Sequence, residues 1–159
     1  GRTGQTLEWA KQQSIASLLT LALDYLSLGR AHLMEAQTSE VSGEQSSHDF
    51  GSLDRAVDGL RGAGRQDILP LGLLARAEMR RVTGALDKAR RDLDEAFSIA
   101  TRGGMRLYEA DCHLEHARLF LASGEKEGAR ESLAIAKKMI EAIGYHRRDG
   151  EVKELEAQL

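Results

Sequence analysis

A pattern of small residues recurs in this chain around Gly84 and again around Gly124, and it restricts the fold more than any other feature. Each of these glycines follows one amphipathic segment and precedes another. Both have an alanine seven positions earlier, and an alanine, a leucine and an alanine five, nine and twelve positions later. Small residues at these intervals let two helices approach closely while the leucine fills the space between them. The pattern therefore predicts a repeat architecture.

Three units carry this pattern, and the first is the least regular. Its equivalent positions, Gly29 and Ala56, are separated by a much longer stretch of chain than Ala77 and Ala89 of the second unit, and the serine-rich stretch 36–49 accounts for the difference. We expect this stretch to be a surface loop, because it loses the apolar periodicity and extra loop length is tolerated. The residues expected to build the repeats are Gly29, Ala56, Leu60, Ala63, Ala77, Gly84, Ala89, Leu93, Ala96, Ala117, Phe120, Gly124, Ala129, Leu133 and Ala136.

Apolar residues three and four positions apart predict helices along the whole chain, and no stretch alternates for long enough to predict a strand. Aromatic residues make up 4% of the chain and there is one proline, while good helix formers such as alanine and leucine are abundant. We therefore expect one all-α domain over 1–159. The expected helices are 5–12, as the tail of a helix that begins upstream, 14–35, 52–63, 68–83, 85–101, 105–123, 125–143 and 150–159.

These helices group into repeats over 14–63, 67–103 and 105–144, and the helix over 150–159 is expected to cap the array. Asp67 and Asp149 stand where a side chain accepts hydrogen bonds from the first amides of a helix, so both are expected to be N-caps. Pro70 is compatible with the first turn of the helix over 68–83, where its missing N–H is not needed.

The overall charge of the chain gives no reason to expect a strongly charged partner. The formal net charge is −3, so it provides no general attraction to nucleic acid or to an anionic membrane, and we expect neither as a partner. The single cysteine, Cys112, has no partner for an internal disulfide, and no apolar stretch approaches the ~20 residues that cross a bilayer. We expect a cytoplasmic protein, and the absence of an initiating methionine indicates a segment of a longer chain.

The repeated units resemble the tetratricopeptide repeat, a helix-turn-helix with a small residue in its first helix and an Ala, bulky, Ala pattern in its second. The resemblance covers residues 14–144 and implies a right-handed α-solenoid of stacked antiparallel helix pairs that binds other proteins. The units here are longer than the usual repeat of about 34 residues. Arg76 and Arg80 stand where that family packs its helices, so these side chains must extend to the surface or pair their charges.

Several phrases are similar to the C-terminal repeat arrays of large bacterial signal-transduction NTPases with NACHT- or NB-ARC-like modules. These phrases are "AVDGLRGAGRQD", "LARAEMRR", "GGMRLYEADCHLEHARL" and "GYHRRDGEV". The resemblance implies a sensor or scaffold arm attached to an NTPase. The sequence contains no G-x-x-x-x-G-K-[ST] phosphate-binding loop, so we expect no nucleotide hydrolysis by this segment and no other enzymatic activity.

The stretch "DCHLEH" contains the usual zinc-ligand types in Cys112, His113, Glu115 and His116. His113 and His116 share a helix face, but Cys112 points away from His116, and a zinc site needs three or four converging ligands. We therefore favour a packing role and expect no metal and no cofactor. Cys112 and His113 diverge by about 100° on a helix, so they are not expected to form a nucleophile and its base.

Carrying over the groove positions of the tetratricopeptide family implies a concave surface of mixed apolar and charged residues. Such a surface suits an extended peptide or a helix of a partner protein. The sequence has no asparagine, whereas the related groove that clamps chaperone C-termini depends on it. The implied groove residues are Leu26, Arg30, Leu33, Leu74, Glu78, Arg81, Leu114, Arg118 and Leu121.

Two further features have both a functional and a structural interpretation. Arg147 and Arg148 are suited to an anion or an acidic partner, but we favour a solvated turn in which Asp149 caps the last helix. Trp9 is either an interface anchor or a residue whose packing partner lies upstream. The function predicted is a non-enzymatic protein-binding scaffold that also self-associates through exposed array ends. The alternative is a small-molecule or metal-responsive sensor with a pocket between helices.

Overall fold

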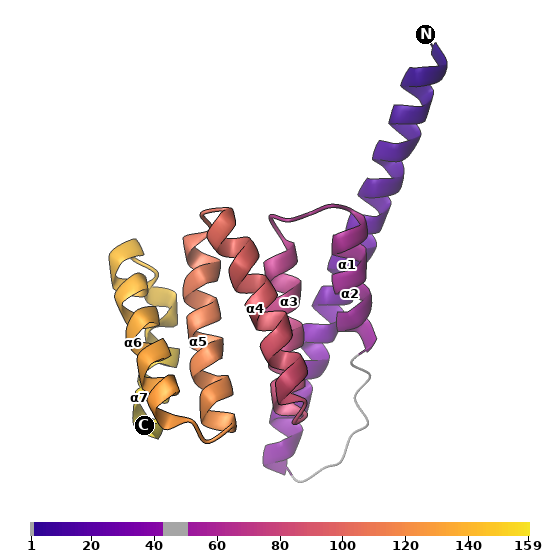
Figure 1. The fold of residues 1–159 in the computed structure, drawn as a ribbon. Helices are drawn as coiled ribbons and strands as arrows, with labels where there is room; N and C mark the ends of the chain where they lie inside the picture. The colour runs from indigo at the N-terminus through magenta and orange to yellow at the C-terminus, as the bar shows by residue number, and fades with distance from the viewer. Residues whose placement is uncertain (1, 43–50) are drawn as a thin grey trace. The chain divides into compact units, whose positions relative to one another are not determined.

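The computed structural model describes residues 2–42 and 51–159, and within these ranges the chain is α-helical and contains no strand. The all-α fold expected from the sequence is confirmed. Figure 1 shows the helices in chain order, which are α1 (Arg2–Ser42), α2 (Gly51–Gly62), α3 (Leu69–Val82), α4 (Leu86–Arg102), α5 (Arg106–Ala122), α6 (Lys126–Ile143), the 3-10 helix η1 (His146–Arg148) and α7 (Asp149–Gln158).

Five glycines of the described chain adopt the left-handed conformation, and they separate these helices at equal intervals along the sequence. Their φ angles lie between 63° and 83°, a region that other residues rarely adopt. After each glycine, the amide of the next residue donates to the carbonyl five positions earlier, at 2.7–3.1 Å, as in the Schellman motif. Each turn therefore has the same form, and it occurs at Gly64, Gly84, Gly104, Gly124 and Gly144.

The chain divides into two compact units, Gly1–Ala75 and Arg76–Leu159. In the first unit α1 packs against α2. The contact is close because it is made through small residues: a Cβ on Gly29 would lie 2.5 Å from the Leu53 side chain, and one on Gly59 would lie 2.7 Å from the Ala22 methyl. Leu26 and Leu33 are buried on the same side of α1.

Helix α1 is longer than expected at both ends. It passes without a break through Gln13 and Ser14, so the separation of a helix over 5–12 from one over 14–35 was wrong, because no residue there ends a helix. It also includes residues 36–42 of the expected loop 36–49; Ala36 is buried and continues the apolar stripe beyond Leu33. The remainder of that loop lies outside the described residues.

In the second unit α4 packs against α5, α5 against α6, and α7 against both α5 and α6. The core between α5, α6 and α7 contains alanines alternating with larger residues, so the helices approach closely and the larger side chains fill the space between them. Its buried members are Ala110, Leu114, Ala117, Leu133, Ala136, Met139, Ile140, Val152 and Leu155.

The alanines and leucines of the recurring small-residue pattern are buried in both units. Phe120 is half-buried and lies against α6, where a Cβ on Gly128 would be 3.0 Å from its ring. The pattern that singled out these positions is thus a pattern of helix contacts rather than of exposed side chains.

Candidate functional site

The implied groove residues lie in different environments. Leu26, Leu33 and Leu114 are buried, so they contribute to helix packing and present no surface to a partner. Arg30 is exposed on α1. The half-buried members are Leu74 and Glu78 of α3, Arg81 of α3, and Arg118 and Leu121 of α5.

Two of these residues, Arg81 and Arg118, hold a buried carboxylate. The side chain of Glu115 on α5 is 5% exposed. Arg81 Nε donates to its Oε1 at 2.6 Å, and Arg118 Nη1 donates to its Oε2 at 3.2 Å. A carboxylate removed from water requires such partners. Both guanidinium groups are therefore part of the internal structure of the second unit, in addition to any role at its surface.

The same network extends to the C-terminal helix. Arg118 also donates to Glu151 of α7, and Arg148 of η1 donates to Glu151 and, at 2.9 Å, to Asp111 of α5. Burial opposes ionisation of Glu151, but its hydrogen bonds from Arg118 and Arg148 outweigh that effect and lower the pKa of its carboxyl group. These ion pairs fasten η1 and α7 to α5.

Arg148 is therefore occupied by carboxylates of its own chain, whereas Arg147 is exposed. The expected N-cap at Asp149 was wrong. Asp149 is the first residue of α7, no side-chain cap hydrogen bond forms there, and its carboxylate lies 3.1 Å from His146 Nδ1. Asp67 similarly engages Arg65, whose guanidinium donates to its two oxygens at 2.9 and 2.7 Å and lowers the pKa of its carboxyl group.

The departure of Arg76 and Arg80 from the repeat pattern is resolved by one buried acid. Asp92 of α4 is 3% exposed and accepts from Arg76 at 2.9 and 2.7 Å and from Arg80 at 2.6 Å. The paired, two-pronged geometry of Arg76 is the strongest form of such contacts. Of the two possibilities expected from the sequence, charge pairing is the one observed.

The residues of "DCHLEH" pack into the helix interface rather than converging on one point. Cys112 is fully buried, and burial raises the pKa of its thiol to about 12. The ring of Phe97 lies edge-on to His113 at 5.1 Å between centroids, and His116 Nε2 lies 3.4 Å from Asp94. Within the described ranges, no group of three or more His, Cys, Asp or Glu side chains is placed to hold a metal ion.

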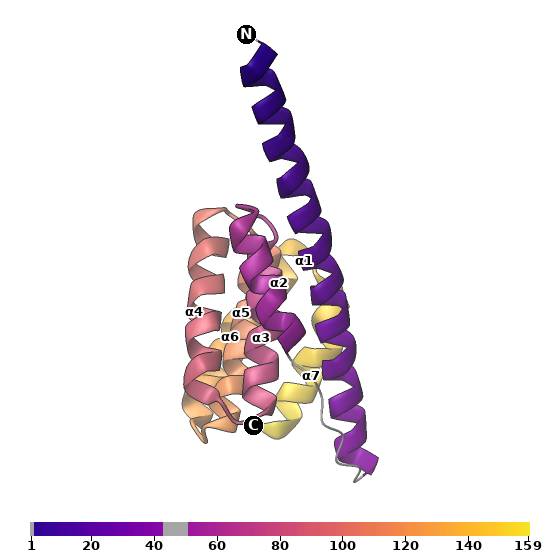
Figure 2. The ribbon, with the colours of Figure 1, turned by 90° about the vertical axis from the view of Figure 1, so that its right-hand side faces the viewer.

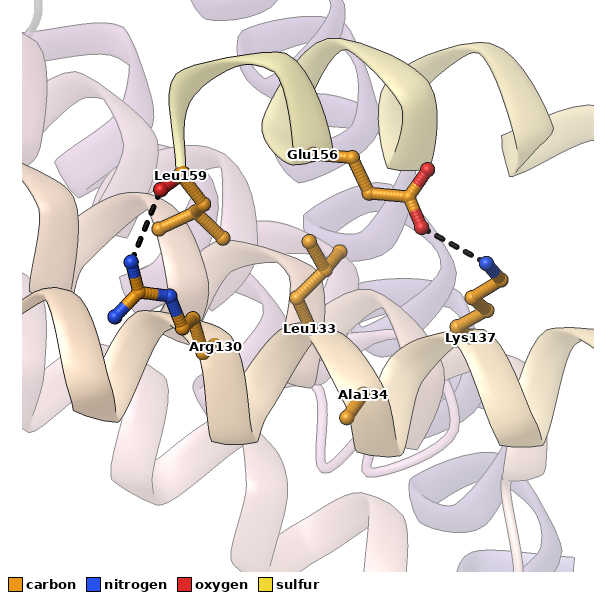
Figure 3. Close-up of a pocket in the computed structure, with 6 residues that line it drawn as sticks. All are labelled: Arg130, Leu133, Ala134, Lys137, Glu156 and Leu159. Carbon is orange, nitrogen blue, oxygen red and sulfur yellow. Dashed lines mark hydrogen bonds and ion pairs between the residues drawn. The ribbon is translucent and has the colours of Figure 1, made fainter.

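A shallow pocket of about 270 Å³ lies between α6 and α7. Figure 3 shows that an interaction spans it at each end: Arg130 Nη2 donates to the Leu159 carbonyl at 3.0 Å, and Lys137 Nζ donates to Glu156 at 2.8 Å. Leu133 lies between these two interactions. The polar groups at the rim are thus already engaged within the chain.

Several large apolar side chains of the first unit are exposed on α1. In Figures 1 and 2 the N-terminal part of α1 continues well beyond the end of α2. Exposed large side chains of this surface retain 41–64% of their accessible area. Residues 4–21 contain only two charged residues, Glu8 and Lys11, whose side chains approach each other to 3.9 Å. The exposed residues are Leu7, Trp9, Ile15, Leu18 and Leu21. Leu7, Leu18 and Leu21 lie on one side of the helix, and Trp9 points to nearly the opposite side.

The sequence offered only Trp9 of this surface, as a possible interface anchor. Ile15 and Leu18 stand at helical spacing from Ala22, Leu26 and Gly29 along the sequence. Because α2 spans 12 residues and α1 spans 41, the apolar stripe of α1 extends beyond the part of α1 that α2 covers. Helix length, rather than residue type, leaves these side chains exposed.

No family model, curated protein or solved structure matches this chain. Across the described residues, no helix combines the length and apolar character needed to span a membrane.

Proposed function

We propose that this chain is a non-enzymatic protein-binding scaffold of the tetratricopeptide type and the partner-binding arm of a larger bacterial signalling protein. The regular helix pairs, their glycine turns and the buried small residues support the repeat assignment. The sequence resemblance to the repeat arrays of bacterial signalling NTPases supports the wider role.

The observation that carries the proposal is the exposed apolar surface of α1. Leu7, Leu18 and Leu21 are exposed on one side of α1, and exposed large apolar side chains on one face commonly mark a binding site for other proteins. This surface lies on a long helix anchored by its C-terminal part against α2. The helix therefore holds the surface in place, and the cost of ordering it on binding is small.

The proposal is tested by replacing exposed apolar residues on and off this surface. Leu18→Glu and Leu21→Glu each place a charge within it. Ile135→Glu is a matched control, because Ile135 is a large apolar residue of α6 that is 45% exposed and belongs to the second unit. The measurement is quantitative mass spectrometry of the proteins that each variant retains from a lysate of the source cells, with helicity checked by circular dichroism.

We expect the two α1 variants to lose a common set of bound proteins that the wild type and the Ile135→Glu variant retain. The same proteins in the same amounts on all four chains would contradict the proposal.

A further inference from the structure

We propose that α7, together with η1, exchanges between two copies of this chain, so that the α7 of each copy occupies the groove between α5 and α6 of the other. This inference concerns the second unit and does not depend on the exposed surface of α1. It follows from the contacts that α7 makes with the groove, from the little apolar surface that α7 buries, and from the glycine at which the chain turns from α6 toward α7.

The inward face of α7 has an apolar stripe with an acid on each side. Successive residues turn by about 100° around a helix axis, so Val152, Leu155 and Leu159 fall within an arc of about 60°. Glu151 lies about 40° beyond one edge of this arc, and Glu156 lies about 40° beyond the other. This face is therefore apolar at its centre and negative at both edges.

The groove that receives this face has basic residues at its edges. Arg118 of α5 donates to Glu151, and Lys137 of α6 donates to Glu156 at 2.8 Å, the second of which Figure 3 shows. The residues of α5 and α6 that share one buried core with α7 include Leu114, Leu133, Ala136 and Ile140. Every copy of the chain has the same groove and the same α7. The α7 of a second copy can therefore make each of these contacts unchanged.

Helix α7 is held by less buried surface than its neighbours. It buries only two apolar side chains, Val152 and Leu155, and it contacts α5 and α6 far less extensively than these two contact each other. It spans 10 residues, and isolated helices shorter than about 12–15 residues are marginal in water. Gly150 in its first turn lowers its helix propensity, and no side-chain hydrogen bond caps its start. Detaching α7 therefore exposes little apolar surface.

Gly144 is the hinge at which α7 can swing away from its own chain. Helix α6 ends at Ile143, and Gly144 follows it with a φ angle of 69°. Glycine adopts negative φ angles about as readily, so rotation at this residue redirects the chain. The ion pair between Arg148 and Glu151 joins η1 to α7, so the two move together. The bond from Arg148 to Asp111 of α5 forms again on the second copy.

The closed chain and the exchanged dimer contain the same contacts except at the hinge. Protein concentration and the conformation of Gly144 therefore decide between them. The closed form prevails in dilute solution, because a helix tethered to its own groove is present there at a high effective concentration. The exchanged dimer should accumulate at high protein concentration, and slowly, because α7 must detach first.

Replacing two glycines near the hinge tests the exchange by sedimentation equilibrium of the intact chain. We expect Gly144→Ala to raise the dimer association constant at least about tenfold over the wild type, because a side chain on a left-handed residue strains the closed form. Gly150→Ala is the matched control. Its backbone is not left-handed, and a Cβ at either position meets no atom within 4 Å. This control should leave the association constant unchanged.

Disulfide trapping identifies the surfaces that meet in the dimer. Chains with Lys137→Cys are mixed at high concentration with chains with Glu156→Cys under mild oxidation, because the two native side chains meet across the groove. In the control mixture Glu154→Cys replaces Glu156→Cys. Glu154 is exposed and lies about 160° around α7 from Glu156. The native Cys112 is buried and will not compete.

We expect the disulfide between two different chains to form in much higher yield in the first mixture than in the control. Equal yields would overturn the exchange. So would a dimer that forms without linkage between positions 137 and 156, because the copies would then associate through another surface. A wild type and a Gly144→Ala variant that both stay monomeric at every concentration would overturn it as well. None of these variants changes α1, so the proposed function is tested separately.

Discussion

Gly29 of α1 and Leu53 of α2 are so close that a Cβ at position 29 would lie 2.5 Å from the leucine Cγ and Cδ2. In most helices a change from glycine to alanine stabilises the fold by up to about 1 kcal/mol, because alanine loses less backbone freedom. At position 29 we expect the opposite effect, a loss of stability. The leucine is fully buried and has little room to move.

We predict that Gly29→Ala lowers the free energy of unfolding by about 1–3 kcal/mol, the usual cost of overpacking a core. Gly4→Ala is a control on the same helix, since a Cβ there meets no atom within 4 Å. It should be neutral or slightly stabilising. Urea denaturation followed by circular dichroism measures both, and equal effects of the two changes would contradict the prediction.

Removing the buried acid between Arg76 and Arg80 should be strongly destabilising. Asp92→Asn removes the charge that both guanidinium groups face, and breaking a buried pair in this way costs about 3–5 kcal/mol. Asp94→Asn on the same helix is the comparison. Asp94 is mainly exposed, and its change should stay within about 0.5 kcal/mol. Thermal and urea unfolding of the two variants test the difference.

The thiol of Cys112 should be unreactive in the folded chain. Burial raises its pKa to about 12, so almost no thiolate is present at neutral pH, and the thiolate is the nucleophile. An aromatic disulfide reagent should therefore label Cys112 only when denaturant unfolds the chain. Rapid labelling of the native protein would show that α5 opens far more readily than its burial indicates.

Acid should loosen α7. The pKa of Glu151 is lowered below the value of 4.5 for a free glutamate, because Arg118 and Arg148 favour its charged form. Its contribution is therefore complete above about pH 4.5 and is lost as pH falls through the lowered pKa. Hydrogen exchange of the α7 amides should accelerate across this range in the wild type. In Glu151→Gln exchange should be faster at neutral pH and change less with acid.

The sequence predicted the helices best where glycine marks their ends. Gly84 and Gly124 allowed both turns to be placed within one or two residues, because a left-handed turn needs a glycine. Gly64, Gly104 and Gly144 carry the same signal at the same spacing, and reading all five together would have located every turn after α2. Between 5–12 and 14–35 the sequence interpretation divided one helix into two, although no glycine or proline separates the two ranges.

The ion pairs that α5 forms with α3 and with η1 could not be predicted from the sequence. Glu115 and Arg81 are separated by 34 positions and Arg148 and Asp111 by 37, so no local spacing relates them. Only the packing of α5 against its neighbours decides which acid meets which base. Asp149 was assigned a cap that it does not form, because α7 begins at Asp149 itself and the N-cap position falls on Arg148. The exposed part of α1 results from the difference in length between α1 and α2. Helix ends are the part of a structure that a sequence predicts least well.

The equal spacing of the five left-handed glycines has a consequence for how such a chain changes over generations. Because each helix and its turn together occupy the same length of chain, a gene segment that encodes two of them can be duplicated or lost between equivalent glycines without disturbing any remaining turn. The new junction would join a helix end to a helix start of the kind already found there. Lengthening by whole helix pairs is therefore open to this protein in a single genetic event.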